Sequence, residues 1–160
     1  MREVERIAQQ LRQAFAGPAW HGPSVLEVLR EVDADTAADK PIPGAHSIWE
    51  LVLHLAATQD AMLRRLRGEP AGKVEEEFWP PAPEPAAEAW QSLLERLQRQ
   101  EEVLTAAVVA FPDDRLGELL TPEGSSAYNN FHGHAQHNTY HAGQIALLKK
   151  AASGRTARRT

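Results

Sequence analysis

The chain has 160 residues, 42% of them hydrophobic, which fits one globular domain large enough to bury a core. Its 17 basic and 22 acidic residues give a formal charge of −5, which argues against a nucleic-acid-binding protein. The absence of cysteine excludes disulfides, zinc–thiolate sites and a cysteine nucleophile. No apolar run approaches the roughly 18 residues of a membrane-spanning helix, so we expect a soluble cytoplasmic protein that binds no membrane.

The spacing of apolar residues predicts an all-α chain, because no strand-like alternation extends beyond a few residues. Apolar side chains recur at helical spacing in four long segments and one short segment. We predict helices over residues 3–15, 24–32, 47–67, 85–110 and 127–152.

The segments between these helices indicate how the bundle is connected. Residues 33–46 are predicted to form a linker, and the proline-rich residues 68–85 a crossover longer than a hairpin needs. Four long helices with one long crossover are typical of a four-helix bundle. We therefore predict a single domain over residues 1–152, followed by a disordered C-terminal tail at 153–160.

Two histidines in the last predicted helix, His137 and His141, stand four residues apart. This spacing places both imidazoles on one face of a helix, one turn apart, where they can grip one metal ion. A third ligand has to come from another segment, and His54 in the second long helix is the best candidate. Because Asn138 occupies the position of the glutamate in an HExxH motif, the helix supplies no base for zinc-protease chemistry.

Three imidazoles without a carboxylate leave coordination positions open, which is the arrangement of a catalytic metal site. This ligand set does not choose among zinc, nickel, iron and manganese. A metal ion with an open position lowers the pKa of a bound water or thiol and produces a nucleophile near neutral pH. The simplest alternative is a set of hydrogen-bonded core histidines without any metal.

Neighbouring side chains have more than one interpretation. His134 is an alternative ligand or a residue that supports one, although the i,i+4 pair is favoured over it. Glu50 and Gln144 are candidates for orienting a ligand ring, but a capping box at the start of the second long helix already explains Glu50. His46 fits a surface turn better than a pocket mouth, and Trp79 is assigned to core packing.

Two segments resemble motifs of the DinB-like (DinB/YfiT) superfamily of metal-binding four-helix bundles. PIPGAHSIWELVLHLA, residues 41–56, looks like the second-helix motif that ends in the first metal histidine. HNTYHAGQIALLKK, residues 137–150, looks like the HxxxHxGQI motif of the fourth helix. The resemblance spans about residues 1–152, and its three metal histidines correspond to the same candidates, His54, His137 and His141.

The resemblance implies an up-up-down-down style bundle, commonly dimeric, with a divalent metal at one end of the bundle core. The family is predominantly bacterial, and its members include a maleylpyruvate isomerase and thiol S-transferases that use bacillithiol, mycothiol or glutathione. We therefore expect a homodimeric, metal-dependent enzyme of the thiol S-transferase or hydrolase type. It would act on a small-molecule substrate, with a low-molecular-weight thiol as candidate cosubstrate. The alternative is a non-catalytic metal- or ligand-binding or sensing bundle.

Overall fold

The computed structural model describes residues 1–70, 75–121 and 124–156. Over these ranges the chain is helical, and its only strand-like feature is an isolated bridge between Leu119 and Ser126. The four long helices are α1 (Glu3–Ala16), α4 (Ile48–Leu66), α5 (Ala87–Ala110) and α6 (Ala127–Thr156). The short elements are α2 (Val25–Leu29), α3 (Ala34–Ala38) and two 3-10 turns, η1 (Glu75–Glu77) and η2 (Asp113–Arg115). None of the described helices is long and apolar enough to cross a membrane.

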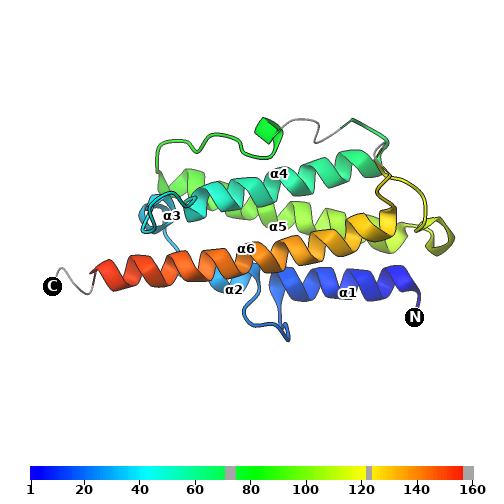
Figure 1. The fold of residues 1–160 in the computed structure, drawn as a ribbon, viewed down its shortest axis with the longest axis horizontal. Coiled ribbons are helices and arrows are strands. Elements are labelled where there is room, and N and C mark those ends of the chain that lie inside the picture. The colour runs from blue at the N-terminus through cyan, green and yellow to red at the C-terminus, as the bar shows by residue number, and fades with distance from the viewer. Residues whose placement is uncertain (71–74, 122–123, 157–160) are drawn as a thin grey trace.

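The four long helices lie side by side, with α1 and α6 running one way and α4 and α5 the other (Figure 1). The connection after α4 returns the chain along the bundle before α5 begins (Figure 1). Consistent with this, Trp49 near the start of α4 packs on Trp90 near the start of α5, with 5.1 Å between ring centroids. The four-helix bundle with one long crossover is therefore confirmed. The up-up-down-down order is wrong, since that order needs two crossovers and this chain has an up-down-down-up order with one.

Some predicted bounds differ from the structure, and the helix predicted over residues 24–32 is limited to Val25–Leu29. The prediction that residues 33–46 form a plain linker is wrong, because they contain α3, whose Ala34 and Ala37 are buried. Asp33 starts that helix by accepting a hydrogen bond from the backbone N–H of Thr36 at 2.8 Å. At the other end of the chain, α6 continues to Thr156, so residues 153–156 of the predicted tail are helical. Residues 157–160 lie outside the described residues.

The buried core consists of two apolar clusters with polar side chains between them. On α5, Leu97 belongs to one cluster and Leu104 to the other, and the buried Glu101 lies between them in the helix. On α4, Gln59 occupies the corresponding position and is fully buried. The described part of α6 contributes His134, Asn138 and His141 to this layer, all of them buried. The polar layer is where the candidate functional groups of the bundle gather.

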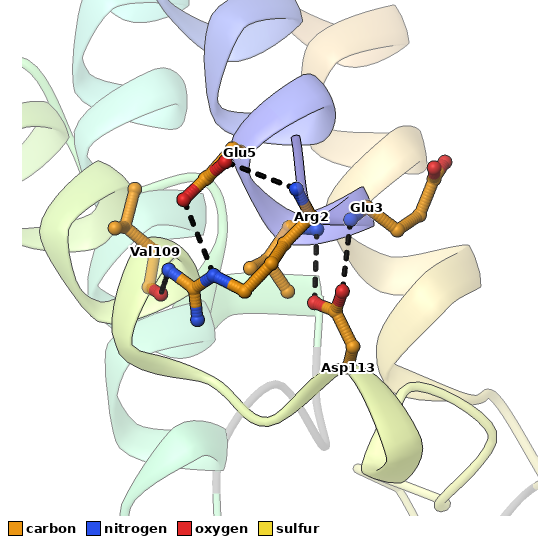
Figure 2. Close-up of polar contacts among 6 residues, drawn as sticks. Arg2, Glu3, Glu5, Val109 and Asp113 are labelled. Carbon is orange, nitrogen blue, oxygen red and sulfur yellow. Dashed lines mark hydrogen bonds and ion pairs between the residues drawn. The ribbon is translucent and has the colours of Figure 1, made fainter.

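The start of α1 is fixed to the end of α5 by hydrogen bonds (Figure 2). The Asp113 carboxylate accepts from the backbone N–H groups of Glu3 at 2.9 Å and Val4 at 3.2 Å. These are donors that the first turn of a helix cannot satisfy internally. Arg2 adds a bond to the carbonyl oxygen of Val109 at 3.1 Å. These contacts hold the start of α1 against the end of α5 and the turn that follows it.

The packing of the first cluster predicts that Leu97→Ala lowers the free energy of unfolding by about 2–5 kcal/mol, because the side chain is wholly buried and its loss leaves a cavity. Urea unfolding followed by circular dichroism measures the change. Arg99→Ala, two residues away on the exposed side of α5, is the matched control and is expected to change stability by no more than about 0.5 kcal/mol. Equal losses in the two variants would contradict this description of the core.

Candidate metal centre

The structure brings together the three histidines that the sequence singles out. His54 lies in the second turn of α4 and faces His137 and His141 on α6. One ligand nitrogen from each residue lies within 4.8 Å of the other two. The Nε2 atom of His137 is 2.9 Å from that of His54 and 3.0 Å from that of His141. Three ring nitrogens therefore converge on one small volume.

Two of the three rings are held in a defined tautomer by carbonyl oxygens. His54 Nδ1 lies 2.8 Å from the backbone oxygen of Phe78, and His141 Nδ1 lies 2.6 Å from Gln144 Oε1. Because a carbonyl oxygen only accepts, each Nδ1 carries the hydrogen and each neutral ring keeps a lone pair on Nε2. Both lone pairs are directed at the Nε2 atom of the third ring.

The third ring, His137, cannot satisfy both neighbours at once. If its Nε2 carries a hydrogen, that hydrogen is one donor facing two acceptors. If its Nδ1 carries the hydrogen instead, three lone pairs face one another. Its Nδ1 is buried without a hydrogen-bond partner, so no acceptor fixes the tautomer. A single cation among the three Nε2 atoms satisfies all of them in the second case.

The donor set fits a divalent transition metal. Bonds of about 2.0–2.1 Å at tetrahedral angles put zinc-bound nitrogens roughly 3.3 Å apart. The two short Nε2 separations, 2.9 and 3.0 Å, are within a few tenths of an ångström of that spacing. Imidazoles are accepted by several divalent metals, and three of them leave a coordination position open. The three histidines are thus a group that could hold a metal ion.

Burial keeps these rings in the neutral form that binds metal. Desolvation, together with the smaller effect of the nearby histidines, lowers the pKa of His137 to about 3. Desolvation also lowers the pKa of His141 to about 4, although the Gln144 acceptor opposes the shift. The pKa of His54 is lowered by burial as well, against the effect of the Phe78 carbonyl. Near neutral pH no proton has to leave these nitrogens before a metal binds.

An aromatic side chain from the crossover stacks on one of the candidate ligands. Trp79 is stacked between His46 and His54, with 4.0 Å between ring centroids on each side and interplanar angles of 12° and 7°. Phe78, next to it in the chain, supplies the carbonyl that fixes His54. The crossover therefore contacts His54 twice: the Phe78 carbonyl accepts from Nδ1, and Trp79 stacks on the face of the ring. His46, assigned from the sequence to a surface turn, instead lies at the margin of this site with its side chain 53% exposed.

Two of the candidate orienting residues behave differently. Gln144 does orient a ligand ring, and its own amide nitrogen donates to the Tyr140 hydroxyl at 3.3 Å. Glu50 does not orient His54. It caps the start of α4 through Ser47 and contacts the side chains of Lys40 at 2.8 Å and His46 at 3.4 Å.

The alternative ligand His134 lies outside the convergent group. Its Nε2 atom is 2.9 Å from a carboxylate oxygen of Glu101, in the middle of the bundle. Sequence reasoning missed this pairing and the Phe78 carbonyl. A backbone acceptor has no residue-type signal, and Glu101 looks like one of many acidic positions along α5.

Comparison with known proteins agrees with this geometry. A family model described as the DinB superfamily matches residues 19–145, which is most of the chain and includes all three histidines. No curated protein and no solved structure was found to match the chain.

The lowered pKa values predict that the metal-free protein loses stability in acid. Below about pH 6.5 the unfolded chain binds protons that His137 and His141 refuse in the folded state, so the free energy of unfolding falls as the pH falls. Between pH 7 and pH 5 we expect a loss of about 1–2 kcal/mol for each of these histidines, measured by urea unfolding after chelation. In His137→Gln the loss of unfolding free energy between pH 7 and pH 5 should be smaller by the amount due to one histidine, about 1–2 kcal/mol. An unchanged loss in that variant would contradict the assignment.

Proposed function

The chain belongs to the DinB superfamily, and we propose that His54, His137 and His141 hold one divalent transition-metal ion at the centre of an enzyme site. The observation that carries this proposal is the pair of carbonyl-fixed rings, whose Nε2 lone pairs are aimed at the third ring. Zinc, nickel, iron and manganese all remain candidates. Homodimerisation and a cytoplasmic location stay predictions from the sequence.

The reaction we propose is activation of a small thiol or of water for attack on a small electrophile. A divalent ion bound there would lower the pKa of a thiol or water at its open coordination position. The chain has no cysteine, so the sulfur must arrive with a low-molecular-weight cosubstrate. In the thiol reaction the S–H proton passes to solvent. Sulfur then bonds to the electrophilic carbon, and the leaving group departs with its electron pair. In the hydrolytic version water takes the place of the thiol.

The residues around the centre orient the ligand rings. The Phe78 carbonyl fixes the tautomer of His54, and Trp79 fixes the plane of its ring. The Gln144 amide oxygen fixes the tautomer of His141. Fixing ligands in this way lowers the cost of assembling the site and sets the direction of the open position. Trp79 also covers one face of the His54 ring.

Metal content tests the site directly. Untagged protein purified without chelator is expected to contain about one divalent transition metal per chain by elemental analysis. His137→Ala is expected to contain almost none. His132→Ala, on the same helix but outside the convergent group, is the matched control and should keep the metal. If neither the parent protein nor reconstituted samples take up metal, the enzyme proposal fails with the site.

Activity is tested on the metal-saturated protein with glutathione, mycothiol and bacillithiol against monochlorobimane, whose fluorescence reports C–S bond formation. We expect turnover with one thiol that is lost in His137→Ala and kept in His132→Ala. Stoichiometric metal without turnover toward this or hydrolysable substrates would overturn the catalytic proposal. It would favour the alternative of a metal-binding or sensing bundle.

The role of Gln144 gives a graded test of the proposed centre. Gln144→Ala removes the acceptor from His141 Nδ1 and is expected to weaken metal affinity about 10- to 100-fold, measured by competition with a chelating dye. Gln144→Glu keeps an acceptor oxygen at the same place and should restore most of the affinity. If both variants bind metal like the parent protein, the amide does not orient the ligand.

A further inference from the structure

The polar layer of the bundle contains a second cluster, separate from the three convergent histidines. Glu101 on α5 pairs with His134 of α6 at 2.9 Å, and Gln59 of α4 donates to the same carboxylate oxygen at 2.8 Å. The side chains of His134 and Glu101 are only 3% and 4% exposed. A buried carboxyl group of this kind is expensive to keep in a bundle core, and the metal centre makes no use of it.

This cluster leaves acceptor atoms without partners. Seven buried side-chain polar atoms of the described residues have no hydrogen bond, and four of them belong to this layer. They are the second carboxylate oxygen of Glu101, the hydroxyl of Thr105 and the amide oxygens of Gln59 and Asn138. Buried acceptors without donors cost free energy, so such a concentration indicates a place where donors are to be supplied.

A groove beside α5 is lined by two residues of this cluster. It lies between α1 and α5, has a volume of about 580 Å³, and is lined by apolar side chains that include Phe15, Leu26 and Val109. Glu101 and Thr105 line the same groove and are themselves 3% and 7% exposed. Apolar walls with a few convergent polar groups at the base, in this range of volume, are the features of a small-molecule site.

We propose that this groove binds a small organic amine with an apolar body. The ammonium group donates to the free oxygen of Glu101 and to the hydroxyl of Thr105, and the body packs against Phe15, Leu26 and Val109. A charged donor to a carboxylate is among the stronger hydrogen bonds, and it satisfies two of the unpartnered acceptors together.

The charges at the groove favour a cation over an anion. An anionic ligand would meet the carboxyl groups of Glu101 and Glu102, and Arg12 is the one arginine or lysine among the residues that line the groove. A neutral hydrocarbon would leave the acceptors of Glu101 and Thr105 as they are. The site is independent of the three-histidine centre, because none of the three convergent histidines lines the groove.

The test measures binding of 2-phenylethylamine and 2-phenylethanol to the metal-saturated full chain by two-dimensional NMR titration. We expect saturable amine binding with shifts on α1 and α5, at least tenfold tighter than the alcohol. Glu101→Gln is expected to weaken amine binding about 10- to 100-fold. Ala106→Phe fills the groove from an exposed position of α5, leaves the core intact, and should block both ligands.

Two control variants distinguish amine binding in the groove from amine binding elsewhere. His137→Ala should bind the amine as the parent protein does, which excludes an amine bound to the metal. Arg12→Gln should bind it equally well or more tightly, because a cationic neighbour is removed. Equal affinity for amine and alcohol, insensitivity to both Glu101→Gln and Ala106→Phe, or shifts confined to the three-histidine centre would each overturn the proposal.

Discussion

The centre depends on two hydrogen bonds that point away from it. The backbone oxygen of Phe78 and the amide oxygen of Gln144 take the Nδ1 hydrogens of two imidazoles. That leaves the Nε2 lone pairs no role except to face the third ring. Metal-binding histidines are usually oriented by a hydrogen bond to the other ring nitrogen, and here His54 and His141 each have such a bond. The rest of the bundle serves to deliver these two oxygens to the right places.

The parallel course of α4 and α5 explains why the connection between them is long. A short loop would make those helices antiparallel, whereas here they run in the same direction (Figure 1). The returning segment passes over the start of α4, where Phe78 and Trp79 contact His54. One connection therefore sets the up-down-down-up order and also supplies the contacts that hold His54.

The polar layer has a cost that the apolar clusters must offset. Leu97 and Leu104 lie on either side of Glu101 along α5, and each belongs to one of the two apolar clusters. Because an apolar cluster lies on each side, the polar groups between the clusters are buried away from water. Burial lowers the pKa of His54, His137 and His141 and so keeps these three rings neutral. The Glu101–His134 pair lies in a low-dielectric setting, and several buried acceptors nearby have no hydrogen-bond partner.

Much of this structure was readable from the sequence. Apolar periodicity located the four long helices, and Ser47 with Glu50 located the start of α4. The i,i+4 histidine spacing, with His54, identified the three residues that converge. Other features were not readable, since they depend on contacts between distant segments. The Phe78 carbonyl carries no side-chain signal, the stacking of Trp79 depends on the path of the crossover, and the partner of His134 lies 33 residues away on α5. Likewise α3 is only five residues long and depends on packing against α4 rather than on its own periodicity.

The most direct test of the central claim is long-range ¹⁵N NMR of the imidazoles in the metal-free and zinc-loaded protein. We expect His54 and His141 to carry their hydrogen on Nδ1 in both states. We also expect zinc to shift the Nε2 resonances of His54, His137 and His141, and of no other histidine. Hydrogen found on Nε2 of His54 or His141 in the zinc-loaded protein, or zinc-dependent shifts at His132 or His134 in place of these three, would contradict the proposed metal centre.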